Sequence, residues 1–274
     1  MAAQSKRFNI ATSITLFVIA FALWQIYDLI MLYTNPPILT ISLLYLTIPS
    51  LILVMFVLFT KLSKSALPKQ GYGKPANLST SKCTILGIVF IIIYILIYLF
   101  PAFSAGNFSV RGVSTSPFAI GHRIVSAILL GLAAESVFRG YIFRNLTKNL
   151  GFFASLYVSS IFFALYNVSI RDVIGLTLDE VGIYAFTRVL PSFAAGLFLG
   201  YFFYKVGWSL LGSATFAIGV RYFLSPIPIV SSGGLAPWWM SVTLDSMSYI
   251  IFIFIVDSII KEPAHVRRRY GLGE

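Results

Sequence analysis

Long apolar runs, separated by short polar connections, occupy most of the chain. Eight such runs can be read, at approximately 10–33, 38–60, 84–103, 124–146, 151–169, 183–205, 207–224 and 238–260. Most of them approach 20 residues, the length with which a helix crosses a hydrocarbon core of about 30 Å, although the fifth and seventh runs are shorter. The pattern predicts an all-α, polytopic membrane bundle of about eight transmembrane helices, with residues 1–274 as a single integral membrane domain.

The composition supports a membrane location and narrows the chemistry. Hydrophobic residues make up 58% of the chain and charged residues 11%, whereas soluble domains carry about 25% charged residues. The single cysteine, Cys83, excludes an internal disulfide and a cysteine-based metal site. A net charge of +11 in a polytopic protein is typical of basic loops that meet anionic headgroups. The expected partner is therefore the lipid bilayer and not nucleic acid.

The positive charges between the apolar runs are distributed unevenly. If the N-terminus is cytoplasmic, the cytoplasmic segments contain Lys6, Arg7, Lys61, Lys64, Lys69, Lys74, Lys82, Arg144, Lys148, Lys205, Lys261, Arg267, Arg268 and Arg269. The opposite side then contains Arg111, Arg123, Arg171 and Arg221. The positive-inside rule therefore predicts both termini in the cytoplasm of a multi-pass protein, which we place in the cell membrane. A basic, flexible loop at 61–82 and the tail at 261–274 are expected on the cytoplasmic side.

Ionisable residues inside the apolar runs are candidates for function. Glu135 and Arg139 lie four residues apart, so a helix would place them on one face, one turn apart. Glu135 is about 16 Å into its run at 1.5 Å per residue, which puts it near the membrane midplane. Groups at that depth face protein or a water-filled cavity, so the two form either a buried ion pair or part of a functional site. Other such residues lie closer to the ends of their runs, where they could reach the interface: Asp28, Arg188, Asp245 and Asp257.

Three segments in this part of the chain carry a family resemblance. The run Glu135-Ser-Val-Phe-Arg139-Gly-Tyr-Ile-Phe resembles the first motif of the CPBP intramembrane proteases, Glu-Glu-x-x-x-Arg followed by Gly-Tyr-Leu-Phe. This family includes the type II CAAX prenyl endopeptidases and bacteriocin-immunity proteins. The run at 159–167 is similar to the second motif, Phe-x-x-x-His, and 194–210 resembles the stretch that leads into the third motif, His-x-x-x-Asn or Asp. The resemblance implies a CPBP-like core at about 118–224 and an intramembrane protease fold.

The differences from the family pattern fall on the residues that carry its chemistry. Ala134 stands where the first motif has its first Glu, and Asn167 stands where the second motif has its His. The third motif, which we place at about Thr215 and Gly219, contains no His and no Asn or Asp. In the family, the first Glu and the histidines are thought to activate water and hold the oxyanion, or to bind a metal.

The chain offers few ligands for a metal. A catalytic zinc site needs about three His, Cys or carboxylate ligands. The two histidines lie at the start of the fourth run, His122, and in the C-terminal tail, His265, so neither is expected near Glu135. The sequence therefore predicts no metal and no cofactor. Arg139 would also hold Glu135 ionised in a pair, and such a carboxylate is a weak base for attack on an amide.

The leading functional hypothesis is a catalytically inactive CPBP-fold protein that serves as a structural or partner-binding subunit of a membrane complex. Small residues at 131–134 and 194–200 permit close helix contact, either within the chain or with another membrane protein chain. One alternative is a divergent intramembrane CAAX-type endopeptidase that uses Glu135 and Asn167. Another is a transporter, although the inverted repeat expected of that class is absent from the sequence. Whether the chain is an enzyme stays open at this point.

Overall fold

The computed structural model describes residues 2–34, 37–63, 67–73, 78–104, 108–110, 117–224, 229–231 and 238–261. Its elements, in chain order, are α1 (Ala2–Thr34), α2 (Ile38–Leu62), η1 (Leu67–Gln70), α3 (Thr80–Ser104), β1 (Phe108–Val110), α4 (Pro117–Glu135), η2 (Ser136–Phe143), α5 (Arg144–Leu150), α6 (Phe152–Tyr166), α7 (Ile170–Val173), α8 (Leu178–Lys205), α9 (Leu210–Leu224), β2 (Ile229–Ser231) and α10 (Trp238–Ile259). The predicted helical membrane fold is confirmed. The residues discussed above that lie outside the described residues are Lys64, Lys74, Arg111, His265, Arg267, Arg268 and Arg269.

Six helical segments of the described chain are long and apolar enough to cross a membrane: Phe8–Thr34, Thr40–Leu62, Thr80–Ile97, Ile120–Leu150, Leu178–Lys205 and Val242–Ile259. The fifth and seventh apolar runs form α6 and α9, which are apolar but have only 15 residues each. At 1.5 Å per residue such a helix extends about 22 Å, which is shorter than a hydrocarbon core of about 30 Å. All eight runs are therefore helical, but a count of eight crossings is not confirmed.

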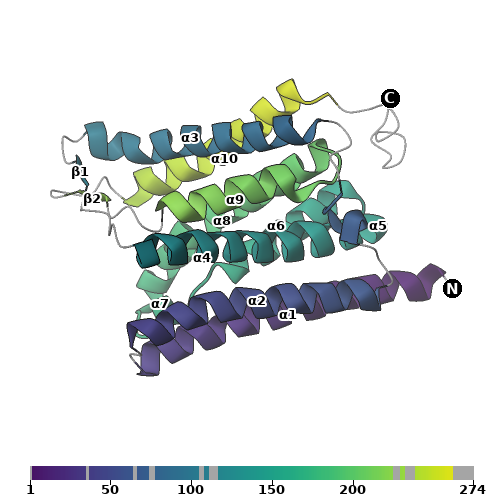
Figure 1. Cartoon of the computed structure of the whole chain (residues 1–274), viewed down its shortest axis with the longest axis horizontal. Helices are drawn as coiled ribbons and strands as arrows, with labels where there is room; N and C mark the ends of the chain where they lie inside the picture. The colour runs from purple at the N-terminus through teal and green to yellow at the C-terminus, as the bar shows by residue number, and fades with distance from the viewer. Residues whose placement is uncertain are drawn as a thin grey trace.

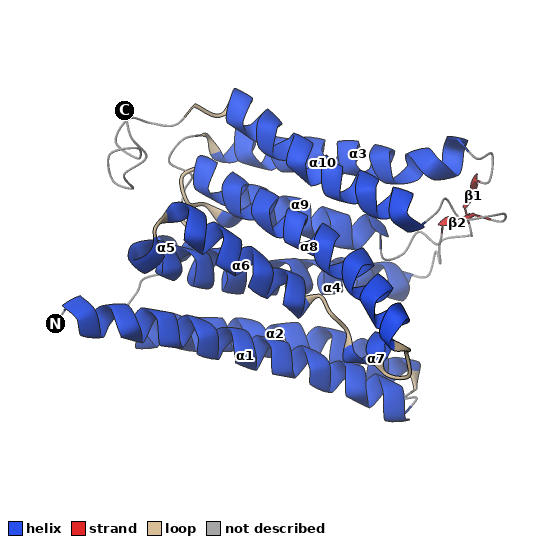
Figure 2. Cartoon of the chain, turned by 180° about the vertical axis from the view of Figure 1, so that it is seen from behind, coloured by secondary structure: helices blue, strands red, loops and turns tan. Residues whose placement is uncertain are grey.

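The helices form a bundle with two distinct ends. Helices α1 and α2 pack together along one side, α3 and α10 lie along the opposite side, and α4, α6, α8 and α9 lie between them (Figure 1, Figure 2). Helix α1 begins and α10 ends at the same end, which we call the termini end (Figure 1). The antiparallel pair of β1 and β2, the start of α4 and the short α7 lie at the other end, which we call the ribbon end.

Small residues let the central helices approach one another closely. A Cβ atom on Gly131 of α4 would lie 2.6 Å from Ile218 Cγ1 of α9. A Cβ atom on Gly196 of α8 would lie 2.9 Å from the Cα atom of Ser160 in α6. The small residues at 131–134 and 194–200 therefore support close contacts within the chain.

The helix that begins as α4 changes its winding at the site of the first motif. Residues 136–143 form a π-helix, η2, and all eight of them are buried. A wider turn of this kind moves side chains relative to a regular helix and often occurs at functional sites. The apolar run at 124–146 predicted a helix here, but its periodicity gave no sign of the change in winding.

The segment 67–73 packs against η2 and covers it from the termini end. The Tyr72 hydroxyl forms a hydrogen bond with Ser136 Oγ, and the Gly71 carbonyl accepts a hydrogen bond from the Leu210 amide at 2.9 Å. A Cβ atom on Gly140 would lie 2.6 Å from the Gln70 carbonyl oxygen, so only glycine fits that contact. The prediction of a flexible loop at 61–82 is therefore wrong for residues 67–73, because tertiary hydrogen bonds hold them.

Candidate functional site

The predicted ion pair between Glu135 and Arg139 is present in the interior of the bundle. Arg139 Nη1 lies 3.1 Å from Glu135 Oε1, and the two side chains are 2% and 0% exposed. Glu135 is the last residue of α4, and Arg139 lies in the first turn of η2. The pair therefore spans the point at which the helix changes its winding.

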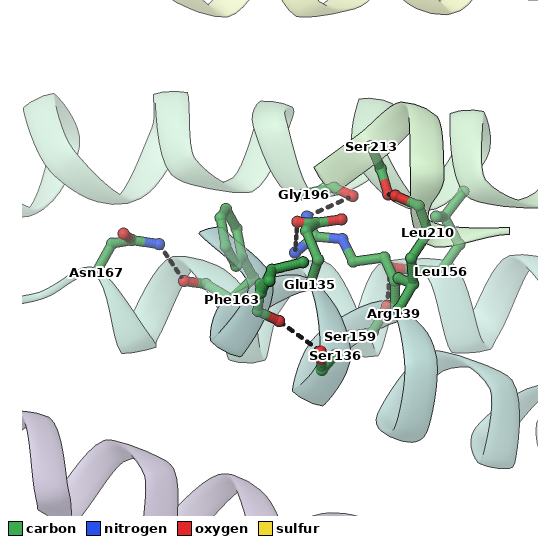
Figure 3. A network of polar contacts seen from close by, with 11 residues as sticks. Glu135, Ser136, Arg139, Leu156, Ser159, Phe163, Asn167, Gly196, Leu210 and Ser213 are labelled. Carbon is green, nitrogen blue, oxygen red and sulfur yellow. Dashed lines mark hydrogen bonds and ion pairs between the residues drawn. The ribbon is translucent and has the colours of Figure 1, made fainter. Parts of the chain in front are cut away.

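Arg139 has two further contacts, from two other helices. Its Nη2 atom donates a hydrogen bond of 3.4 Å to the Gly196 carbonyl of α8. Its guanidinium carbon lies 4.1 Å from the centre of the Phe163 ring of α6, which is a cation–π distance. Figure 3 shows the guanidinium between the Glu135 carboxylate and the Gly196 carbonyl. One buried arginine thus connects α4, η2, α6 and α8.

Glu135 also contributes to the wall of a cavity of about 570 Å³. The lining residues come from α1, α2, α4, α6, α8, α9 and α10, together with the residue that follows α6. They are Trp24, Tyr45, His122, Arg123, Ser126, Ala127, Leu130, Ala134, Glu135, Phe163, Asn167, Arg188, Pro191, Ser192, Ala195, Leu199, Phe216, Ala217, Val220, Arg221, Asp245 and Tyr249. Cavities of this size with a mostly apolar wall and a few polar groups are typical of small-ligand sites.

Asn167, at the position of the second-motif His, lines this cavity together with Ala134 and Glu135. It follows the last residue of α6, and its Nδ2 atom donates a hydrogen bond of 2.7 Å to the Phe163 carbonyl (Figure 3). The amide therefore closes the end of its own helix. One hydrogen of the same NH₂ group remains for another acceptor.

Thr215 and Gly219, at the positions assigned to the third motif, do not line the cavity. The Thr215 hydroxyl donates to the Leu211 carbonyl of its own helix at 2.7 Å. A Cβ atom on Gly219 would lie 2.1 Å from Ile91 Cδ1 of α3. This side of α9 therefore packs against α3. The residues of α9 that line the cavity are Phe216, Ala217, Val220 and Arg221.

The residues of the site do not fit a metal ion. No group of three or more His, Cys, Asp or Glu side chains lies close enough together to hold one among the described residues. His122 Nε2 lies 3.1 Å from the Ser42 carbonyl oxygen, toward α2. Cys83 is buried in α3, and its carbonyl faces Gly212 of α9. Two carboxylates, Glu135 and Asp245, do line the cavity, but they have no third ligand beside them.

Sequence analysis missed three features of the site. The Gly196 carbonyl was not considered as a partner for Arg139, because a backbone acceptor in another helix leaves no sequence signal. Arg123 and Arg221 were read as charges on the side opposite the cytoplasm, but both line the cavity. Ser213 is fully buried beside Glu135 and was noted only as part of a run without histidine. Each feature depends on how separate helices face one another.

The comparison with protein families agrees with the motifs. The family model described as type II CAAX prenyl endopeptidase Rce1-like matches residues 116–220, from the start of α4 into α9. No curated protein shows a significant match to the chain. The matched segment contains Glu135, Arg139 and Asn167 and agrees with the core that the motifs placed at about 118–224. The resemblance that the motifs indicated is therefore confirmed over residues 116–220, which are similar to this family. The six candidate membrane spans make the chain a multi-pass integral membrane protein.

Proposed function

We propose that this protein is a catalytically inactive member of the CAAX-protease-like fold that binds other molecules in the membrane, as a structural or partner-binding subunit of a membrane complex. The observation that carries the proposal is the state of Glu135. The carboxylate is fully buried and 3.1 Å from the Arg139 guanidinium, which is itself fixed by Phe163 and Gly196.

A general base for amide hydrolysis must reach a water molecule and accept its proton. Glu135 is buried at the wall of the cavity, and its carboxylate is paired with the Arg139 guanidinium at 3.1 Å. Moving the carboxylate out of the pair to accept a proton would leave a buried guanidinium without its partner. The ion pair therefore suits a structural role better than proton transfer.

The groups that would complete the chemistry are also engaged elsewhere. An oxyanion donor has to point at the developing charge, but the Asn167 amide donates to the Phe163 carbonyl. Gly219 accommodates Ile91, and Thr215 donates within its own helix. The order of the family motifs is retained together with a cavity, while Thr215 and Gly219, at the positions of the third motif, make contacts outside that cavity. This combination favours binding without turnover.

A second candidate is a divergent endopeptidase that cuts prenylated or membrane-embedded substrates. The observation in its favour is that Glu135 and Asn167 line the same cavity. In this alternative Glu135 would activate water, and the second hydrogen of the Asn167 amide would stabilise the oxyanion. It requires Glu135 to leave Arg139 when substrate binds.

A cleavage assay on a prenylated CAAX peptide separates the two candidates. The full chain, purified in detergent, is compared with Glu135→Gln, with Asn167→Ala and with the matched control Asp179→Asn, which changes an exposed acid of α8 outside the cavity. We expect no turnover by any of the four proteins. Turnover that is retained in Asp179→Asn and lost in Glu135→Gln would establish the endopeptidase and end the proposal. Co-purification of a second membrane chain at constant stoichiometry tests the partner-binding role.

We also propose that both termini are cytoplasmic, in a single membrane domain. The shared position of the start of α1 and the end of α10 supports this orientation, as does the excess of lysine and arginine between the predicted spans on that side (Figure 1). Labelling of single cysteines by an impermeant maleimide tests it, with Cys83 replaced by Ser. A cysteine at Asp172 in α7 should react in intact cells, whereas one at Lys61 should react only after lysis.

A further inference from the structure

Three arginines from three different helices line the ribbon end of the cavity. Arg123 comes from α4, Arg188 from α8 and Arg221 from α9. None of them forms an ion pair or a hydrogen bond with any residue that the structure describes. Of the four arginines described at this end, Arg171 of α7 is the one that does not line the cavity. We call Arg123, Arg188 and Arg221 the arginine cluster.

The acids of the cavity do not balance this charge. Glu135 is already paired with Arg139. Asp245 of α10 accepts a hydrogen bond from the Tyr94 hydroxyl at 2.5 Å. Three guanidinium groups therefore share one cavity with a single carboxylate that has no basic partner in the described structure. Uncompensated charges close to a membrane core are costly, which favours an anion among them.

The position of the cluster adds a second argument. Arg123 lies near the start of α4, Arg221 near the end of α9 and Arg188 in the first half of α8. These parts of the helices lie toward the ribbon end (Figure 1), where few lysines and arginines occur between the predicted spans. Attraction to the cytoplasmic leaflet does not explain cations at that end. Arg188 is exposed and Arg123 and Arg221 are half-buried, so a ligand can approach them. A binding role for the cluster explains both its place and its convergence on one cavity.

The rest of the cavity wall is apolar and aromatic. It includes Trp24, Leu130, Leu199, Phe216, Val220 and Tyr249. Such a wall suits a hydrocarbon chain, since burying apolar surface is favourable. A volume of about 570 Å³ falls within the range of sites for single small ligands.

We propose that this cavity binds a single-chain amphiphile through a phosphate group, with the arginine cluster around the phosphate and the apolar wall against the chain. Guanidinium groups bind phosphate through paired, charge-assisted hydrogen bonds, and several phosphate oxygens can engage three arginines together. The inference goes beyond the proposed function, because a site at the ribbon end does not depend on whether Glu135 is catalytic.

Three probes separate the phosphate from the chain. The full chain, in nanodiscs of phosphatidylcholine, is titrated with 1-oleoyl lysophosphatidate, with 1-oleoylglycerol, which has the chain without the phosphate, and with inorganic phosphate. We expect lysophosphatidate to bind at least about tenfold more tightly than either of the others and to raise the melting temperature. Equal binding of 1-oleoylglycerol would overturn the role of the arginines. Equal binding of inorganic phosphate would assign the site to a free anion and overturn the amphiphile.

Variants locate the site. Arg123→Gln, Arg188→Gln and Arg221→Gln should each weaken lysophosphatidate binding by about tenfold, whereas Arg171→Gln, at the same end but outside the cavity, should leave it unchanged. Ala217→Trp fills the apolar part of the cavity without removing a charge and should also weaken binding. Unchanged binding in all three cluster variants, or an equal loss in Arg171→Gln, would overturn the proposal. No peptide is present, so this result is independent of the cleavage assay.

Discussion

Two groups of charged residues meet at one cavity, which Glu135 of the first group and all three arginines of the second line, and the groups differ in whether the chain supplies partners for their charges. The first, which we call the ion-pair cluster, consists of Glu135, Arg139 and their contacts Phe163 and the Gly196 carbonyl, and every charge in it has a partner within the chain. The second is the arginine cluster, whose members have no ion pair or hydrogen bond in the described structure. A charge that the chain itself pairs contributes to the architecture of the bundle, whereas charges that the described chain leaves unpaired are available to a ligand, as proposed above for the arginine cluster.

The comparison makes opposite predictions for the two groups. Removing one member of a buried ion pair leaves the other charge without a partner in the low-dielectric interior, which is strongly destabilising. Removing a charge that no residue satisfies costs the folded state little and costs ligand binding much. Stability measurements on single variants therefore test the division directly, and the largest effect is expected in the ion-pair cluster.

Arg139→Leu should lower the free energy of unfolding by about 3–5 kcal/mol, because it leaves the Glu135 carboxylate buried without its cation. It also removes the link from η2 to Phe163 and to the Gly196 carbonyl. The measurement is folded yield after detergent extraction, followed by unfolding in a series of detergent mixtures. Unchanged yield and unchanged melting would show that the pair does not hold the helices together.

The double variant Glu135→Gln/Arg139→Met is the matched control for that loss. Both charges are removed together, so no buried charge is left unpaired, and we expect the double variant to be more stable than Arg139→Leu. If the two variants are equally unstable, the loss comes from packing and not from the charge. That result would contradict the contrast drawn here between the paired charges of the ion-pair cluster and the unpaired charges of the arginine cluster.

Part of this arrangement could be predicted from the sequence, because it depends on local spacing. The apolar runs predicted all the long helices, and the four-residue spacing predicted the contact of Glu135 with Arg139. The family motifs also placed Asn167 near Glu135, and both line the cavity. Where a feature rests on one helix or on a motif that names its partner, the sequence carried enough information.

The remaining features depend on how distant segments meet, which periodicity does not report. The docking of Gln70 on Gly140 joins residues 70 positions apart. Gly219 looked like a lost catalytic position, but it accommodates Ile91 of α3. Arg123 and Arg221 looked like interface charges, and only the packing of α4 against α9 brings both to the cavity. These contacts are set by helix register, so they emerge only in the fold.

Gly140→Ala should cause the next largest loss in the free energy of unfolding. It tests how firmly segment 67–73 packs against η2. The new methyl group would lie 2.6 Å from the Gln70 carbonyl, a backbone atom that has to move. We expect a loss of about 1–3 kcal/mol, in line with overpacking of a buried site. The measurement is the melting temperature of the full chain in detergent.

Gly182→Ala is the matched control, because it lies in α8 with no atom within 4 Å of its added Cβ. The greater helix propensity of alanine should leave that variant unchanged or stabilise it by up to about 1 kcal/mol. A stabilising effect of both alanines would show that segment 67–73 rests only loosely on η2.

Tyr72→Phe should have a smaller effect and depends on pH. The variant loses the hydrogen bond to Ser136, with an expected cost of about 0.5–1 kcal/mol near neutral pH. Partial burial of the phenol raises the pKa of Tyr72, although the hydrogen bond with Ser136 acts in the opposite direction. Because burial disfavours the phenolate, the stability of the folded wild type falls as the pH rises from about 10, the pKa of an unfolded tyrosine, toward the raised folded-state pKa, and Tyr72→Phe is free of that loss. The free energy of unfolding of both proteins is measured at pH 7 and pH 11. A difference between wild type and Tyr72→Phe that is the same at both pH values would contradict this pH dependence.

Arg221→Gln should have the smallest effect on folding. It is the most direct test of the arginine cluster. Arg221 lines the cavity near the end of α9, whereas Glu135 and Arg139 already pair with each other. With no hydrogen bond or ion pair to lose, the free energy of unfolding should change by less than about 0.5 kcal/mol. Unfolding without added ligand measures this, and a loss as large as that of Arg139→Leu would place Arg221 in the architecture. An unchanged free energy of unfolding together with weaker lysophosphatidate binding would show that Arg221 serves ligand binding and is not needed for folding.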